Sequence, residues 1–188
     1  ANSCRFNNDD SAYMNIAFGT NSQATSHKFT YSFWVKRASL GEQVLTSSYY
    51  SSSYYGIIRF IDTDEFEVYD YRTSGKVRKI TNRLFRDLGA WYNIVVSSDN
   101  SVSSPELKIY VNGVQETSFR ITDEYVQDET TSFNNDYNNY IGEEPSRYYF
   151  DGYMAEVCFI DSLALAPTSF GEFNSDSPTI WQPIDVSG

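Results

Sequence analysis

Positively charged residues are scarce in this sequence of 188 residues. It has 14 Lys and Arg against 25 Asp and Glu, which gives a formal net charge of -11 at pH 7. Such a chain repels a phosphate backbone or an anionic membrane surface, because its acidic side chains cannot replace the counterions there. The sequence also has no run of about 18 apolar residues, the length that spans a bilayer. We therefore predict no nucleic-acid partner and no membrane insertion.

Cysteine and histidine are also rare. Two cysteines, Cys4 and Cys158, are too few for a disulfide framework or a zinc site. The single histidine, His27, has no Ser or Cys partner in a recognisable catalytic motif. These residues therefore indicate neither a zinc site nor a nucleophile activated by histidine.

Aromatic residues, by contrast, make up 17% of the chain, with 16 Tyr and 13 Phe. Aromatic residues favour strands, and the many Ser, Thr and Asn residues favour turns and strands over helices. All-β sandwiches of this length are commonly single domains. We therefore predict an all-β fold that forms one domain over residues 1–188.

Two segments carry clear strand patterns. In FTYSFWVKR, residues 29–37, bulky apolar side chains at every second position place one face of a strand toward a core. In ELKIYVNGVQ, residues 106–115, the same alternation ends at Asn112-Gly113, a pair that tolerates positive φ in a type I′ turn. These patterns predict antiparallel strands joined by tight turns. Helical turns are expected only at 82–89 and 167–173.

Six segments together resemble one known family. They are RFNNDDSAY at 5–13, SFWVKR at 32–37, LFRDLGAWYNIVV at 84–96, IYVNGVQ at 109–115, IG at 141–142 and FDGYMAEVCFIDSLALAPTSFGE at 150–172. They are similar to the concanavalin A-like lectin/glucanase superfamily, specifically to the laminin G-like jelly-roll modules in structural proteins of tailed, mostly aquatic bacteriophages. The resemblance implies an antiparallel β-sandwich with a concanavalin A-like jelly roll. Because that module commonly continues past a W-x-P element, here Trp181–Pro183, the chain is either part of a longer polypeptide or a compact variant.

The resemblance also implies where the two cysteines lie. In such jelly rolls the first strand lies beside the late strand that follows the turn at Phe150–Gly152, which would bring Cys4 near Cys158. Alternation points Cys4 inward but Cys158 away from its inward-facing neighbours. A disulfide bond and a pair of free thiols therefore both remain open.

A sugar-binding platform is the first site that the resemblance implies. Lectin-like jelly rolls present aromatic rings and short polar groups to carbohydrate, and the candidates here are Trp34, Tyr69 and Tyr71. The alternative is that Trp34 belongs to the core and that the tyrosines are cross-strand pairs.

Calcium is the second implied ligand, because many laminin G-like modules hold it at the rim of the sandwich. Calcium needs six to eight oxygen ligands, and the candidates are Asp9, Asp10 and Asp151, with Glu143 and Glu144 as further acids that could converge on them. Ala155-Glu156 stands where many relatives carry Asp-Glu, which removes one ligand. The alternative is that these acids only form turns. We expect no required cofactor, with calcium as the candidate metal.

Catalysis is not expected. Glycoside hydrolases of this superfamily space their acids as E-x-D-x-E, so that alternate side chains point into one groove. The nearest segment, Asp64 to Glu67, lacks that spacing. We therefore predict that the chain is not an enzyme.

Taken with the resemblance, these features predict a non-enzymatic protein of the virion surface, outside the cell, in a tail fibre, spike or capsid decoration. Its role would be adhesion to host-surface or other glycans, with copies arrayed as a homo-oligomer beside other virion proteins. The alternative is a structural decoration protein without glycan binding, held by protein contacts through its Tyr-rich loops at 49–55 and 148–149.

Overall fold

The structure, a computed structural model, describes residues 3–17, 27–73, 75–145 and 147–186. Within these residues the chain forms antiparallel sheets and no α-helix, which confirms the predicted all-β sandwich. Two short 3-10 helices span Asn8–Asp10 and Pro167–Ser169. No helix in the described part of the chain is long and apolar enough to span a membrane.

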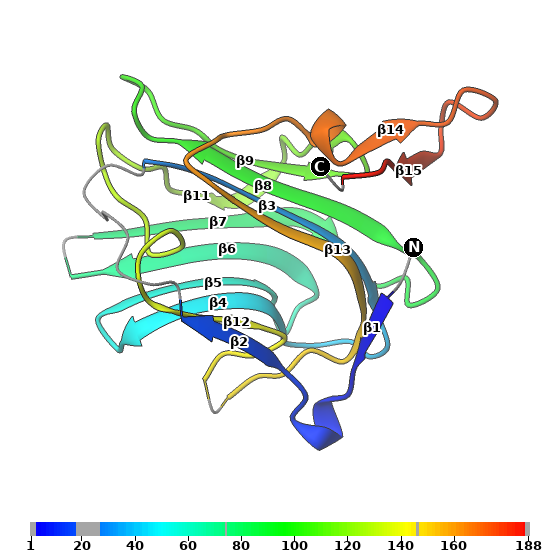
Figure 1. The fold of residues 1–188 in the computed structure, drawn as a ribbon, viewed down its shortest axis with the longest axis horizontal. Helices are drawn as coiled ribbons and strands as arrows, with labels where there is room; N and C mark the ends of the chain where they lie inside the picture. The colour runs from blue at the N-terminus through cyan, green and yellow to red at the C-terminus, as the bar shows by residue number, and fades with distance from the viewer. Residues whose placement is uncertain (1–2, 18–26, 74, 146, 187–188) are drawn as a thin grey trace.

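Two large sheets face each other among the described residues (Figure 1). The six-stranded sheet contains, in spatial order, β1 (Ser3–Phe6), β13 (Gly152–Asp161), β3 (Lys28–Arg37), β8 (Tyr92–Asp99), β9 (Leu107–Val111) and β10 (Val114–Gln115). The seven-stranded sheet contains β11 (Phe119–Thr122), β7 (Gly75–Leu84), β6 (Glu65–Arg72), β5 (Tyr54–Phe60), β4 (Gln43–Ser51), β12 (Asn138–Ile141) and β2 (Met14–Ala17). A separate pair, β14 (Gly171–Phe173) and β15 (Trp181–Pro183), projects at one corner of the sandwich (Figure 1).

The core lies between the two large sheets. The alternate residues of β3 that the sequence places on one face, Phe29, Tyr31, Phe33 and Val35, are at most 3% exposed. They belong to one buried cluster with side chains from the seven-stranded sheet, among them Ile58, Phe60, Phe66 and Val68. Burial of each such side chain contributes about 1.5–3 kcal/mol. The predicted inward face of residues 29–37 is therefore confirmed.

The hairpin at Asn112-Gly113 also forms as predicted. Both residues have positive φ, +49° and +78°, and they join β9 to β10. Asn112 Oδ1 accepts a hydrogen bond from the backbone N–H of Asn93 at 2.8 Å, which ties the turn to β8. Trp181 packs on Gly113, where an added Cβ would lie 2.4 Å from the indole ring.

The first strand lies beside the late strand, but the cysteines are not bridged. Cys4 on β1 is opposite Met154, whereas Cys158 is opposite Ser32 on the other side of β13. Four residues along a strand correspond to roughly 13 Å, well beyond the Cα separation of a disulfide. Both cysteines are free. The register therefore corrects the suggested bridge between Cys4 and Cys158.

The helical turn expected at 82–89 does not form. β7 continues to Leu84, and Phe85 then turns its ring into the core, where it is fully buried against Phe60 and Phe66. The Phe85 N–H donates to the carbonyl of Asp64 at 2.8 Å. Burial of the ring and this backbone bond keep the chain out of a helix at Phe85, and a turn follows at residues 88–89. The short helix at Pro167–Ser169 lies inside the second expected range.

The connection between β11 and β12 closes one part of the interior. Two of its aromatic residues, Tyr125 and Phe133, are buried in the core cluster. The connection is fastened to β6 through the buried carboxylate of Asp70, which accepts hydrogen bonds from Tyr125 Oη at 2.9 Å and from Ser132 Oγ at 2.6 Å. Burial raises the pKa of Asp70, although Arg72 and these donors oppose that shift.

Candidate functional site

Four tyrosines gather on the outer face of the seven-stranded sheet. Tyr49 on β4, Tyr55 on β5 and Tyr71 on β6 lie directly opposite one another across the strands, and Tyr69 lies two positions before Tyr71 on the same face. Their side chains point outward because the alternate residues of β6, such as Phe66 and Val68, fill the core. We call Tyr49, Tyr55, Tyr69 and Tyr71 the tyrosine platform.

The rings of the platform touch and are half-buried. The ring of Tyr55 is central, with centroid distances of 6.3 Å to Tyr49, 5.8 Å to Tyr69 and 5.3 Å to Tyr71. Burial, followed by the charge and hydrogen bond of Tyr69, raises the pKa of Tyr55 to about 12. The Tyr55 phenol therefore stays neutral near pH 7 and keeps its O–H as a donor.

A charged row borders the platform on the same face. Glu67 on β6 is fully buried and accepts hydrogen bonds from Arg59 Nε and from Arg78 Nε, both at 2.5 Å. The guanidinium of Arg78 also lies 5.8 Å from the ring centroid of Tyr69. Glu67 therefore holds two arginines at the border of the platform and orients their remaining N–H donors.

A pocket of about 260 Å³ opens beside the platform rings Tyr49 and Tyr55. Tyr49 and Tyr55 line it on the sheet, and Glu144 and Arg147, which follow β12, line the opposite wall. Ser47 Oγ donates to the carbonyl of Glu143 at 2.7 Å, which fastens this wall to β4. Burial raises the pKa of Glu144, while Arg59 and Arg147 oppose the shift. The pocket thus combines two rings with one carboxylate and one guanidinium.

The acids nearest to a hydrolase motif are held by arginines. Burial acts to raise the pKa values of Asp64 and Glu65, but their hydrogen bonds, including those from Arg86 and Arg120, outweigh burial and hold both pKa values below the ordinary range. Glu67 is held by two arginines, as described above. A general acid for glycoside cleavage needs a raised pKa and an open groove, so Asp64 and Glu65 do not fit that role.

The structure separates the predicted sugar-binding residues. Tyr69 and Tyr71 belong to the tyrosine platform, whereas Trp34 is on β3 and faces outward from the six-stranded sheet. Trp34 is half-buried, and it lines a different groove of about 330 Å³ with Trp91 and Pro183. Stacked sheets lie about 10 Å apart, so Trp34 and the tyrosines cannot contact the same sugar.

The sugar-site prediction did not include Tyr49, Tyr55, Arg59, Arg78 or Arg147, and it placed Tyr49 and Tyr55 only in the Tyr-rich interface segment 49–55. The alternation in FEVYDYR identifies the outer face of β6, and the same reading of YYGIIRF would have added Tyr55. Alternation does not identify the outward side of Tyr49, because irregularities between Val44 and Thr46 and after Tyr49 interrupt the pattern of β4.

The predicted calcium ligands do not fit a calcium site. Asp151 forms an ion pair with Arg5 at 2.8 Å, and Asp10 accepts a hydrogen bond from Asn7 Nδ2 at 2.6 Å in the turn that Asn7 caps. Among the residues that the structure describes, no group of three His, Cys, Asp or Glu side chains could hold a metal ion. Calcium needs more oxygens than Asp9, Asp10 and Asp151 bring together here. Calcium binding by the chain stays a prediction.

Several solved structures are similar to this sandwich. Domain 4 of AbnA, a GH43 extracellular arabinanase from Geobacillus stearothermophilus in complex with arabinotriose, is 19% identical, with a TM-score of 0.55 over 76% of this chain and 64% of that one. Domains LG4-5 of the mouse laminin α1 chain are 13% identical, with a TM-score of 0.59 over 98% of this chain and 42% of that one. The chain thus spans less than two thirds of the length of these two structures.

A third similar structure is the CBM40 of the Ruminococcus gnavus IT-sialidase bound to α2,3-sialyllactose. It is 13% identical, with a TM-score of 0.53 over 78% of this chain and 81% of that one. At these identities the likeness shows the fold alone. No curated protein matches the chain by sequence.

The sequence also matches a family model. The model describes the Concanavalin A-like lectin/glucanases superfamily and matches residues 8–167, most of the chain. This match agrees with the sandwich topology and with the laminin domains of the same fold. The chain therefore belongs to the concanavalin A-like lectin/glucanase superfamily.

Proposed function

We propose that the chain is a non-catalytic glycan-binding module whose ligand lies on the tyrosine platform. The observation that carries this proposal is the juxtaposition of four outward-facing rings with the ion pairs of Glu67 and with the pocket at Glu144. The apolar CH face of a sugar ring packs on aromatic rings, while its hydroxyls need donors and acceptors close by. The platform offers both within one face of one sheet.

The fold adds support to this proposal. Two of the similar structures are recorded with an oligosaccharide, arabinotriose in one and α2,3-sialyllactose in the other. Both share the sandwich with this chain, so the architecture is compatible with sugar binding. The choice of sugar depends on side chains, which differ at these low identities.

We further propose that the chain acts at the virion surface in a tail fibre, spike or capsid decoration, where it adheres to host-surface glycans. The resemblance of the segment at 150–172 to phage structural modules supports this role. Single sites of this open kind bind weakly, and copies arrayed in a homo-oligomer beside other virion proteins raise the effective concentration.

A glycan array probed with the chain displayed on streptavidin tetramers tests glycan binding. We expect specific signals that fall about tenfold in Tyr71→Ala and in Tyr55→Ala, because each variant removes a ring from the centre of the platform. Tyr153→Ala is the matched control, since Tyr153 is an exposed tyrosine on the six-stranded sheet. Signals that persist unchanged in both platform variants would count against the proposal.

A structural decoration protein held by protein contacts is the second candidate function. The observation in its favour is the ring of Tyr50, which is 68% exposed and stacks on Tyr137 with centroids 5.1 Å apart. Exposed aromatic side chains of this kind are enriched in protein interfaces. If this candidate holds, Tyr50→Ser should abolish self-association in sedimentation velocity, and neither the wild type nor the variant should give signals on the glycan array.

A further inference from the structure

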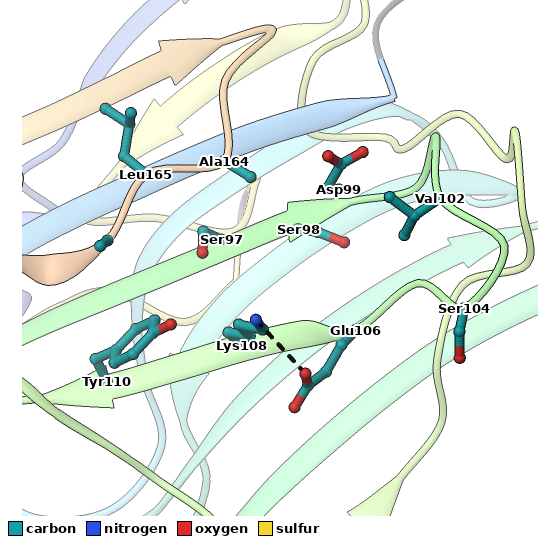
Figure 2. Close-up of a pocket in the computed structure, with 11 residues that line it drawn as sticks. Ser97, Ser98, Asp99, Val102, Ser104, Glu106, Lys108, Tyr110, Ala164 and Leu165 are labelled. Atoms are coloured by element: carbon teal, nitrogen blue, oxygen red, sulfur yellow. Dashed lines mark ion pairs between the residues drawn. The ribbon is translucent and has the colours of Figure 1, made fainter.

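A second pocket lies on the outer face of the other sheet. It has a volume of about 400 Å³ and is lined by the ends of β8 and β9, by the connection between them and by the segment 164–166 (Figure 2). In Figure 2, Ser97, Lys108 and Tyr110 line the pocket from strands β8 and β9, and Leu165 lines it from the segment above them. The tyrosine platform is on the opposite outer face of the sandwich, so the two sites share no residue.

The walls of this pocket are fixed by hydrogen bonds. Thr30 Oγ1 donates to the carbonyl of Leu163 at 2.8 Å and accepts from the N–H of Leu165 at 2.8 Å. These two hydrogen bonds hold the segment 163–165 against β3. On the other side, Asp99 Oδ1 accepts from the N–H and the hydroxyl of Ser101, at 2.9 and 2.6 Å. Thr30 is fully buried, so the upper wall is preformed.

The strand register brings complementary polar groups together at the floor. Ser97 on β8 lies directly opposite Lys108 on β9, and Tyr110 follows two positions later on the same face. Lys108 Nζ lies 3.7 Å from Glu106 Oε2, and both side chains are about half exposed, at 41% and 50%. A contact of this length leaves an ammonium donor and a carboxylate acceptor side by side and open to a ligand. A sugar hydroxyl, which donates and accepts at once, matches such a pair.

The charges around the pocket cancel. Lys108 is balanced by Glu106, and Asp99 is balanced by Lys28 at 2.9 Å. An anion therefore finds no net attraction here, and the net charge of -11 on the whole chain opposes it. The ring of Tyr110 and the side chain of Leu165 supply the apolar contact that the CH face of a sugar needs.

We propose that this pocket is a second ligand site, which takes an uncharged mono- or disaccharide unit through Ser97, Glu106, Lys108 and Tyr110. This site is independent of the tyrosine platform, and a chain that carries both sites binds glycan on two opposite faces. One copy can then bridge two glycan chains, which adds to the effect of arraying copies.

Chemical-shift mapping on the ¹⁵N-labelled chain tests the second site. The neutral probes are the methyl glycosides of glucose, galactose, mannose and N-acetylglucosamine, and the charged probes are glucuronate and glucosamine. We expect at least one neutral probe to shift the amide signals of Ser97, Lys108 and Tyr110. Lys108→Met and Tyr110→Ala should each weaken that binding about tenfold, because each removes a polar or stacking contact.

Matched variants separate this proposal from the first one. Lys76→Met, which removes an exposed lysine of β7 on the other sheet, should leave the binding unchanged. Tyr71→Ala should also leave it unchanged, so that a failure of the tyrosine platform does not alter this result. Lys108→Met removes the ammonium group but keeps a long side chain at the surface. We therefore expect it to fold even if Tyr110→Ala does not. Absence of these shifts with all four neutral probes, tighter binding of a charged probe, or shifts that survive both pocket variants would overturn the second site.

Discussion

Asp70 on β6 and Tyr125 in the connection before β12 are joined by a 2.9 Å hydrogen bond inside the sandwich. Both residues are at most 3% exposed, and 55 positions separate them in the sequence. The bond therefore fastens a long irregular connection to the central part of the seven-stranded sheet. The same connection delivers Phe133 to the core, beside Phe29 and Tyr31.

Removal of that hydrogen bond should destabilise the fold. In Tyr125→Phe the ring still fills its space, but a buried carboxylate loses one donor, which costs about 1–3 kcal/mol. We expect a lower midpoint in urea unfolding with an unchanged slope. Tyr153→Phe removes an exposed hydroxyl and serves as the control. An equal midpoint for Tyr125→Phe and the wild type would show that the bond contributes nothing to stability.

Gly152 should be intolerant of any side chain. An added Cβ would lie 2.2 Å from the carbonyl oxygen of Lys36, within the pairing of β13 with β3. We expect Gly152→Ala to lower the free energy of unfolding by about 2–4 kcal/mol, because backbone must move to relieve the overlap. Gly75→Ala is the control, since no heavy atom lies within 4 Å of its added Cβ. Thermal unfolding of the two variants checks this, and equal melting temperatures would contradict it.

The ion pair between Glu65 and Arg120 should contribute pH-dependent stability. Hydrogen bonds from Thr63 and Arg120 outweigh burial and lower the pKa of Glu65 from its ordinary value of 4.5. A carboxyl with a lowered folded-state pKa stabilises the fold fully above its unfolded-state pKa. That contribution is lost as the pH falls through the folded-state pKa. Glu65→Gln should therefore cost about 1 kcal/mol at pH 7 and progressively less below pH 4.5.

Melting temperatures measured between pH 7 and pH 3 check this dependence. Asp62→Asn, which changes an exposed acid in the same turn, should track the wild type throughout. A difference between Glu65→Gln and the wild type that stays constant down to pH 3 would argue against a proton-linked role for Glu65.

The two thiols should react separately and at different rates. Cys4 is exposed, whereas burial, followed by the charge of Glu156, raises the pKa of Cys158 and lowers its thiolate fraction. We expect Ellman's reagent to modify two thiols in the native protein, Cys4 first. Cys4→Ser should remove the fast phase, and a reductant should not change the melting temperature. If the reagent modified no thiol in the unreduced protein, the result would contradict two free thiols and support a disulfide bond between Cys4 and Cys158.

Glycan binding on the tyrosine platform should depend strongly on how many copies act together. An open face of four half-buried rings gives weak single contacts, whereas linked copies gain from effective concentration. We expect the monomeric chain to dissociate from a glycan surface much faster than streptavidin-linked tetramers, by about 100-fold or more in biolayer interferometry. Equal dissociation rates would mean that single sites suffice.

Part of this structure follows directly from local patterns in the sequence. The alternation at residues 29–37 identifies the buried face of β3, and Asn112-Gly113 identifies the turn between β9 and β10. The candidate site can be predicted only in part from these local patterns. Tyr69 and Tyr71 are on the outer face as their spacing indicates, but Trp34 is on the other sheet. Tyr49 and Tyr55 were predicted only as part of a Tyr-rich interface segment.

By itself, the sequence determined that the chain forms antiparallel strands, which face of each regular strand is apolar, and where the Asn-Gly hairpin turns. Those properties depend on side chains a few positions apart. Only the tertiary structure decided that Tyr49, Tyr55 and Tyr71 meet in one row, that Cys4 lies opposite Met154, and that Trp34 lines a different groove. Register between strands depends on bulges and connection lengths, and a slip of one residue moves every side chain to the other face.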